Sequence, residues 1–273
     1  MKKIIVERRN VNIKDYVKRK ASKTDCSRII DEPCLIYEGD ELKIALIELP
    51  ARDIPFEKAL QSIKYSKDTR TSGLKTNSRI FGFMPRVTIR EDYCHVAGLE
   101  WHNPKAHRIV CNKVKEIIPY YEKLFPKQFN HHKSIIEDKV LNDYQIHGSV
   151  FTSGIINQNN PLNYHFDSGN FAGCLSAMYI NKKNCLGGNL ACPEYDILIK
   201  LKDNQLLLFD GQSILHGVTG FKLFNGGHRY TTVFYSLKQM WNCEPITEEL
   251  ARIKQKRWER EQKRLETIKN AIE

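Results

Sequence analysis

The stretch from about residue 145 to residue 237 constrains the fold of this 273-residue chain more than any other part. Short runs rich in Val, Ile, Tyr, Phe and Thr follow one another here, and turn-forming residues interrupt them at 159–161, 184–188, 203–204, 210–211 and 225–227. Closely spaced short strands of this kind predict a β-sandwich or jelly roll. A further short strand is expected at residues 42–47.

Helical patterns flank this β region. Between about residues 104 and 125, apolar residues recur at spacings of three and four, which predicts one buried helix face that Pro119 kinks or restarts: Val110, Val114, Ile117, Ile118 and Tyr121. After Pro245 the chain reads as a charged helix with one apolar stripe at steps of seven: Ala251, Trp258, Leu265 and Ile272. Residues 66–79 are polar and contain Gly73, and we expect a mobile basic loop there.

These patterns predict a mainly β protein with flanking helices, of the α+β class. We expect a single domain over residues 1–273. Within it, residues 1–70 form a basic N-terminal extension, residues 71–240 form the core with its supporting helix, and residues 241–273 form the charged C-terminal helix.

The positive charge of the chain is unevenly distributed. The sequence has 43 Lys and Arg against 32 Asp and Glu, a formal net charge of +11. Basic residues outnumber acidic ones most strongly in the segments 1–28, 64–90 and 252–270. Such clustering fits a surface that binds a polyanion, whereas the alternative is charge that serves solubility alone.

The eight cysteines include no C-x-x-C pair, so the sequence does not support a structural zinc site. The basic start of the chain has no apolar core of a secretion signal, and no apolar run is long enough to span a membrane. We therefore expect reduced thiols and a protein that is neither secreted nor membrane-bound: cytoplasmic in a bacterial or phage-infected cell, or nuclear in a eukaryote.

A candidate metal site lies within the β region. His165 and Asp167 are two residues apart, and side chains alternate along an extended chain, so both face the same side. His216, which comes after a buried strand and a turn at residues 205–211, is the expected third ligand. Two histidines and one carboxylate on one face of an ion are the ligand set of non-haem Fe(II) oxygenases. An H-x-D pair by itself is common by chance, so a metal site needs support from further residues.

That support comes from the expected strand at residues 229–237. Alternation places Arg229, Thr231 and Tyr235 on one face of this strand. An inward arginine is costly to bury unless it meets an anion, and a dicarboxylate cosubstrate supplies one. The 2-oxo acid end of such a cosubstrate can chelate iron while its far carboxylate accepts a forked guanidinium pair. A pairing of Arg229 with a carboxylate of the protein is the alternative.

In order along the chain, the motifs H-x-D, G-G-x-L, L-L-L-F-D-G, H-G-x-T and R-x-x-x-V-F-Y resemble those of the 2-oxoglutarate oxygenases. The sequence is most similar to the TET/JBP branch, the DNA 5-methylpyrimidine hydroxylases. The similarity rests on residues 165–170 and 229–235 and, more weakly, on residues 79–82 with 92–94. It covers roughly residues 79–237 and implies a double-stranded β-helix (jelly-roll) core.

The resemblance also implies roles for individual residues. His165, Asp167 and His216 would bind Fe(II), while Arg229 and Thr231, helped by Arg79, would bind 2-oxoglutarate. Asn170 would hydrogen-bond the target base and Tyr235 would stack on it. The branch's cytosine readers have a histidine two residues after this tyrosine, and here that position is Leu237. Leucine cannot hydrogen-bond a base edge, so both 5-methylcytosine and thymine remain open as targets.

The resemblance thus implies a monomeric dioxygenase that uses Fe(II), 2-oxoglutarate and O2 on DNA held by the basic segments 1–28 and 64–90. The target nucleotide would be flipped out of the duplex, because a stacked base cannot reach a buried metal. The same metal site could instead serve an RNA base, a protein side chain or a small metabolite. A binding module with a vestigial metal site is the non-enzymatic alternative.

Overall fold

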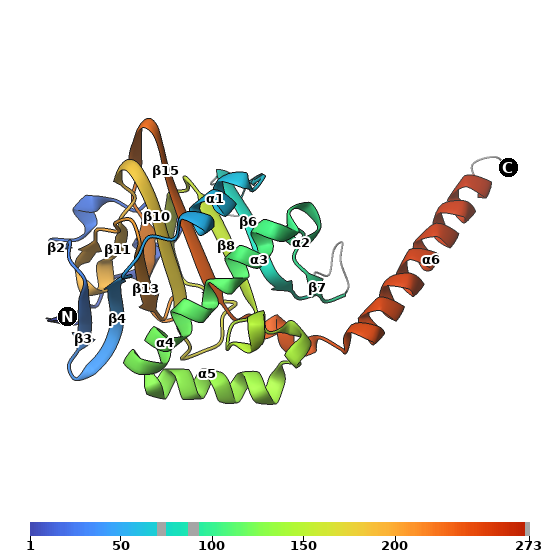
Figure 1. Ribbon diagram of the computed structural model, residues 1–273, viewed down its shortest axis with the longest axis horizontal. Coiled ribbons are helices and arrows are strands. Elements are labelled where there is room, and N and C mark those ends of the chain that lie inside the picture. Colours follow the sequence, from blue (N-terminus) through green and yellow to red (C-terminus); the bar gives the residue numbers. More distant parts are fainter. Residues whose placement is uncertain (70–74, 87–92, 271–273) are drawn as a thin grey trace.

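Two β-sheets face each other in the computed structural model, which describes residues 1–69, 75–86 and 93–270 (Figure 1). The larger sheet runs in the order β1 (Lys2–Val6), β3 (Cys34–Glu38), β4 (Glu41–Glu48), β13 (Gln205–Phe209), β10 (Ser176–Gly187), β15 (Phe221–Tyr235), β8 (Ser153–Gln158), β6 (Lys75–Met84) and β5 (Ser66–Thr69), with β7 (His95–Val96) also paired to β6. The smaller sheet runs β2 (Arg28–Ile30), β12 (Ile197–Ile199), β11 (Leu190–Cys192), β14 (His216–Val218) and β9 (Leu162–His165). The strand predicted at 42–47 and a series of strands across 145–237 are confirmed, whereas residues 225–227, expected to form a turn, lie inside β15.

The central strands of the larger sheet are buried on both faces. On β13, Leu207 and Phe209 point toward the smaller sheet and join the core between the sheets, whereas Leu206 and Leu208 point outward into a core shared with the helices. A strand covered on both sides needs apolar residues at every position, which explains why this run is continuous rather than alternating.

Helices cover the outer face of the larger sheet: α1 (Ile54–Ser62), α2 (Leu99–His102), α3 (Pro104–Asn112), α4 (Val114–Leu124) and α5 (Pro126–Lys139) (Figure 1). Val110, Ile117 and Tyr121 are buried as expected. The chain breaks at Lys113, however, and not at Pro119, which lies inside α4. The helix therefore does not restart at Pro119, because this proline is on the exposed side, where water can satisfy the carbonyl that loses its hydrogen bond.

Residues 1–69 do not form the expected N-terminal extension. They contribute β1, β3 and β4 to the larger sheet and β2 to the smaller one, where β2 runs parallel to β12. Much of their charge is also paired within the protein: Arg8 with Glu194, Arg9 with Asp196 and Arg19 with Asp25. The predicted boundary at residue 70 is therefore wrong, because β4 and β2 pair with β13 and β12, which are remote in sequence.

The loop expected at residues 66–79 is also largely a strand pair. β5 and β6 pair antiparallel from Ser66 with Ser78 to Thr69 with Lys75. Polar residues suit this position because both strands lie near the edge of the sheet. Residues 70–74, including Gly73, lie outside the described part.

The last helix, α6 (Ile246–Asn270), extends away from the rest of the molecule (Figure 1). Its exposed stripe includes Trp258 and Leu265, and Ile272 lies outside the described residues. The helix is long but strongly charged, and no helix in the described part is both long and apolar enough to cross a membrane.

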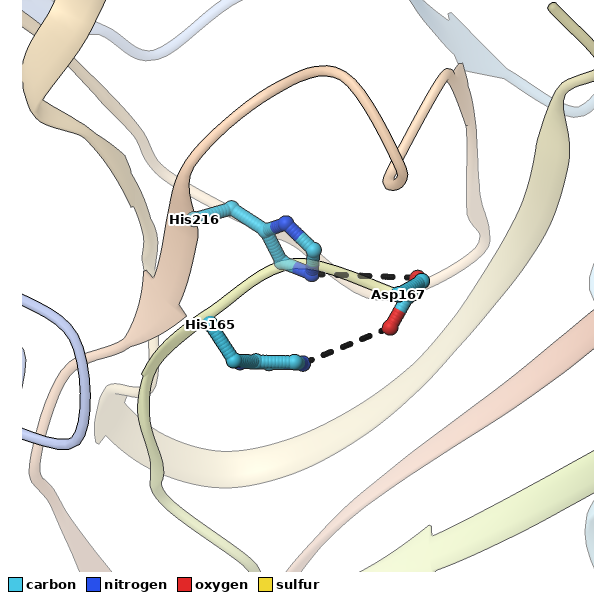
Figure 2. A group of neighbouring side chains, drawn as sticks. All are labelled: His165, Asp167 and His216. Atoms are coloured by element: carbon cyan, nitrogen blue, oxygen red, sulfur yellow. Dashed lines mark ion pairs between the residues drawn. The ribbon is translucent and has the colours of Figure 1, made fainter. Parts of the chain in front are cut away.

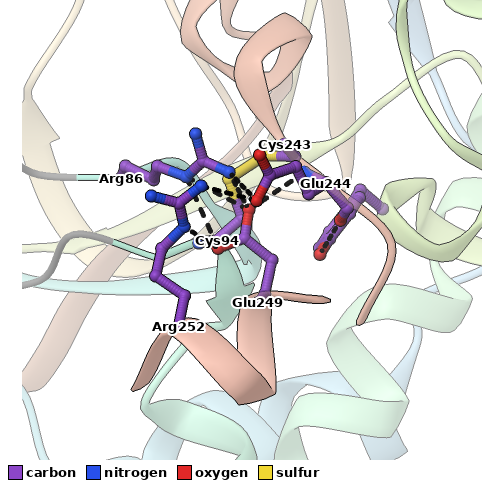
Figure 3. Close-up of polar contacts among 7 residues, drawn as sticks. Arg86, Cys94, Cys243, Glu244, Glu249 and Arg252 are labelled. Atoms are coloured by element: carbon purple, nitrogen blue, oxygen red, sulfur yellow. Dashed lines mark hydrogen bonds and ion pairs between the residues drawn. A yellow bond between two sulfur atoms is a disulfide. The ribbon is translucent and has the colours of Figure 1, made fainter. Parts of the chain in front are cut away.

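A disulfide and a buried glutamate fasten the base of α6 to the body (Figure 3). Cys94 and Cys243 are joined, so the expectation that all thiols are reduced is wrong for this pair. The carboxylate of Glu249, 2% exposed, accepts hydrogen bonds from Arg86 and from the backbone amides of Cys94 and Glu244. Burial alone would raise the pKa of Glu249, but these hydrogen bonds hold it below its ordinary value.

Candidate metal centre

Two strands of the smaller sheet bring the candidate ligands together. β9 ends at His165 and β14 begins at His216, and the antiparallel register pairs these two residues directly. Asp167 follows His165 after one residue, and its backbone amide donates to the carbonyl of Gly211 in the turn that precedes His216. Figure 2 shows the three side chains pointing toward one another.

The distances suit a single ion. One ligand atom from each of the three side chains lies within 4.8 Å of the others. Asp167 Oδ1 is 3.5 Å from His165 Nε2, and Asp167 Oδ2 is 3.9 Å from His216 Nε2. No other His, Cys, Asp or Glu of the described ranges joins such a group.

The ring orientations favour metal binding through Nε2. Nδ1 of His165 is 2.8 Å from the carbonyl of Asn163, and Nδ1 of His216 is 2.9 Å from that of Ile214. A carbonyl can only accept, so each Nδ1 carries the proton and donates, which leaves the Nε2 lone pair free. Burial is the main cause that lowers the pKa of His216, to about 4, and the neighbouring His165 lowers it further. The ring of His216 is therefore neutral and able to coordinate a metal.

Gly211 leaves the space that the carboxylate occupies. A Cβ built on Gly211 would lie 2.3 Å from Asp167 Oδ2 and 3.3 Å from His216 Cε1. Any side chain at this position would therefore push the carboxylate away from the two histidines. Asp210-Gly211, identified in the sequence as a turn, is thus also a packing requirement of the site.

Arg229 lies deep in β15, on the strand face that carries Val233 and Tyr235, both of which line the cavity at the metal site. It is 1% exposed, and its Nε donates to the carbonyl of Gly188 at 3.1 Å. Its Nη2 has no partner, and within the described residues no carboxylate pairs with it. Burial lowers the pKa of Arg229 to about 10, which leaves it cationic at neutral pH.

The backbone of Gly188 lies close to the Arg229 side chain. A Cβ on Gly188 would lie 2.6 Å from Arg229 Nε. The alternative pairing of Arg229 with a protein carboxylate finds no support in the described part. A buried guanidinium with an unused donor fits an anionic ligand. Thr231 is also buried, two residues further along the same face.

The cavity at the metal site has a volume of about 260 Å³. Besides the three candidate ligands, its lining includes Asn170, Tyr235 and Leu237, whereas Arg229 and Thr231 lie beyond its lining. The amide of Asn170 donates to Ser176 Oγ at 3.0 Å, and its backbone carbonyl accepts from Gln212. Asn170 is therefore held in place, and the base-reading role assigned to it stays a prediction, as does that of Tyr235.

Among the lining residues that sequence reasoning missed is the buried, polar Asn157. Asn157 on β8 pairs across the sheet with Thr231, and its side chain lines the same cavity. Its Oδ1 accepts a hydrogen bond from Asn160 at 3.3 Å. Asn157 stands in no motif, and only the pairing of β8 with β15 places it there.

The structure does not place Arg79 beside the metal cavity or Arg229. On β6, Ile80 pairs with Ile155, which lines the metal cavity, but Arg79 pairs with Ile156, which is buried on the helix side. Neighbouring residues of a strand face opposite sides of a sheet. The expectation that Arg79 helps to bind the cosubstrate is therefore not supported, and Arg79 lines a different cavity.

Comparison with known proteins agrees with this site. Residues 90–238 match the Tet_JBP family, described as the oxygenase domain of the 2OGFeDO superfamily. The chain belongs to this family. The match contains all three candidate ligands and Arg229, so the Tet_JBP assignment rests on the part of the chain that builds the metal centre. The superfamily uses Fe(II) and 2-oxoglutarate, and the donor set and the unpaired Arg229 fit both.

Individual relatives are more distant. The chain is 25% identical over 184 residues to thymine dioxygenase JBP1 of Trypanosoma brucei brucei; the alignment covers 66% of this chain but only 21% of that protein. The solved structure of NgTET1 in complex with 5mC DNA has the same fold, with a TM-score of 0.56 and 14% identity over 84% of this chain and 90% of that one. The double-stranded β-helix expected for the Tet_JBP family is confirmed.

Proposed function

We propose that this protein hydroxylates the 5-methyl group of a pyrimidine base in DNA. The observation that carries the proposal is the metal centre with Arg229 behind it, in a chain of the Tet_JBP family. In this proposal His165, Asp167 and His216 hold Fe(II), and Arg229 with Thr231 holds the far carboxylate of 2-oxoglutarate. When bound, these groups and O2 supply the oxidation of a C–H bond.

The size of the cavity supports a small target. Ligand pockets typically measure roughly 300–1,000 Å³, and this one lies just below that range at about 260 Å³. Tyr235 offers a ring and Asn170 an amide at its wall. A single flipped base, with an aromatic face and a polar edge, suits such a cavity better than a peptide does.

The choice of DNA draws on the relatives and on charge near the cavity. One relative is named a thymine dioxygenase, and a protein of the same fold was solved with 5mC DNA. Residues 18–20 lie along β9, the strand that ends at His165. The backbone amide of Lys18 donates to the carbonyl of Tyr164, and Lys20 forms an antiparallel β-bridge with Asn163. Both lysines are exposed and form no ion pair with the described residues, so they are available to phosphates.

The basic segment 64–90 supports the proposal less than expected. Arg86 is committed to Glu249 and Glu244 and is not available to phosphates. Lys64 and Lys67 are exposed, whereas Arg70 and Arg90 lie outside the described residues. We therefore propose that the lysines of residues 14–23 make more of the phosphate contacts to DNA than segment 64–90 does.

Mass spectrometry of nucleosides tests the proposed function. DNA containing thymine, with or without 5-methylcytosine, is incubated with the protein, Fe(II) and 2-oxoglutarate, and then digested. We expect 5-hydroxymethyluracil or 5-hydroxymethylcytosine to appear with the parent protein and to be absent with Asp167→Ala. Turnover of 2-oxoglutarate in the presence of an RNA, protein or metabolite substrate, with DNA nucleosides unchanged, would contradict the choice of DNA.

A further inference from the structure

A second cavity, of about 410 Å³, lies beside the metal cavity, and Ile155 forms part of both walls. It lies along the edge of β6, where β5 pairs only as far as Ser78 and β7 begins to pair only at Phe83. Its lining combines one guanidinium with several rings and hydroxyls: Ser66, Arg79, Tyr93, His95, Trp101 and His102. The oxidation chemistry proposed for the metal centre uses none of these side chains.

Arg79 supplies a positive charge to this cavity and forms no ion pair with the described residues. Nη1 of Arg79 donates to Ser66 Oγ at 3.3 Å, and no carboxylate in the described part lies within ion-pair distance of the guanidinium. Because Arg79 is only partly buried, it can reach a ligand in the cavity while remaining hydrated in its absence. An unpaired arginine at the wall of a cavity suits an anion such as a phosphate.

The rings supply a surface for stacking. Trp101, in the short helix α2, is 75% exposed and stands at the cavity wall. The rings of Tyr93 and His95 lie 5.1 Å apart between centroids, on the opposite side of β6 from β8. Aromatic faces beside a guanidinium are the combination with which proteins bind unpaired nucleotides, because the base stacks and the phosphate pairs with the arginine.

We propose that this second cavity holds a nucleotide next to the target nucleotide of the same DNA strand. Its base stacks on Trp101 and its phosphate pairs with Arg79. The two cavities adjoin at Ile155, so neighbouring nucleotides of one strand can occupy both. This inference rests on the proposed function, and it gives Arg79 a role in substrate binding instead of cosubstrate binding.

The test uses short methylated DNA with 2-aminopurine beside the target base. Stacking on Trp101 should quench its fluorescence when the parent binds, and Trp101→Ala should remove the quenching. We expect Trp101→Ala and Arg79→Ala each to raise KM for DNA about tenfold or more, with Trp101→Phe close to the parent. The KM for 2-oxoglutarate should not change, because neither residue lies at Arg229.

Trp258→Ala is the matched control, since Trp258 is 64% exposed on α6 and lines neither cavity. It should keep the DNA KM and the quenching of the parent. If the parent oxidises DNA but Trp101→Ala and Arg79→Ala both retain its KM and its quenching, the inference is overturned and the proposed function stands. If the parent neither binds nor oxidises DNA, the inference and the proposed function are both wrong. Circular dichroism checks that each variant is folded. If Trp101→Ala is misfolded, the KM of Arg79→Ala still tests the inference.

Discussion

At the scale of single residues, the metal centre depends on Gly211, because a glycine has no Cβ atom and leaves room for the Asp167 carboxylate. The missing Cβ would lie 2.3 Å from Asp167 Oδ2, inside any tolerable contact. We expect Gly211→Ala to weaken metal binding by roughly 10- to 100-fold, as loss of supporting geometry does at other metal sites. Titration with Mn(II) or Co(II) measures this.

Gly220→Ala is the control for that substitution, because a Cβ there meets nothing within 4 Å. It should bind the metal as the parent does. Equal affinities for the Gly211→Ala protein and the parent would show that Asp167 is not a ligand in this position.

Arg229 makes a prediction that separates the cosubstrate from the metal. Its unpaired, buried charge costs stability until an anion arrives. Added 2-oxoglutarate should stabilise the metal-loaded parent by about 2.7 kcal/mol at a concentration 100 times its Kd. Arg229→Met should abolish this stabilisation and bind metal normally, and Arg229→Lys should restore little of it. Undiminished stabilisation of the Met variant would mean that another residue binds the cosubstrate.

At the scale of elements, a buried histidine of α5 contacts the residue that follows β15. His132, fully buried, hydrogen-bonds Ser236 Oγ at 2.9 Å and packs against Phe151 and Phe171. Burial, helped by His131, lowers the pKa of His132 from 6.5 to about 3. Between these values the unfolded chain binds a proton that the folded protein excludes, so stability falls as the pH falls.

This gives a pH dependence of known sign. For this one group the free energy of unfolding should decrease by about 1.4 kcal/mol per pH unit below pH 6.5. From pH 7 to pH 5, the free energy of unfolding measured in urea should decrease by about 2 kcal/mol more for the parent than for His132→Gln, whose side chain cannot titrate. An equal loss in both proteins would show that His132 is protonated in the folded state.

At the scale of the whole molecule, a disulfide joins the residue before strand β7 to the segment before α6. Cys94 and Cys243 are 149 residues apart in sequence, so the bond closes a long loop in the unfolded chain. Reduction should lower the free energy of unfolding by about 2–4 kcal/mol. Urea unfolding with and without dithiothreitol measures this. The double variant Cys94→Ser, Cys243→Ser serves as control and should not respond to the reductant; no response in the parent either would mean that the bond does not form.

The distribution of charge over the molecule makes a prediction about salt. Lys14, Lys18, Lys20 and Lys23 are exposed, without ion pairs to the described residues, in the segment that includes the edge beside β9. Each phosphate contact contributes about 0.9 to the slope of log affinity against log salt concentration on duplex DNA. Replacing Lys18 and Lys20 with Ala should therefore flatten this slope by up to about 2.

Replacing Lys123 and Lys127, which lie on the helices of the opposite side, should leave the slope unchanged. A parent whose DNA affinity is insensitive to salt would contradict binding through phosphates altogether.

The local features of the site could be read from the sequence, because they depend on alternation within one strand. His165 and Asp167 converge as predicted, although Asp167 lies just beyond the end of β9, and Arg229, Thr231 and Tyr235 alternate along one face of β15. The continuous apolar run at 206–209 likewise indicated a strand buried on both faces. The G-G and D-G pairs were recognised as turns or close approaches, although the atoms they approach were not.

Tertiary structure alone decided which strands became neighbours. The pairing of β9 with β14 sets His216 opposite His165, and the pairing of β8 with β15 brings Asn157 to the cavity. The same kind of long-range pairing turned Arg79 away from the metal cavity, drew residues 1–69 into both sheets and brought Cys94 to Cys243. Strand alternation has a period of two and acts within a few residues, whereas sheet order is set by burying both faces of the central strands at once. Only the folded chain can satisfy that second condition.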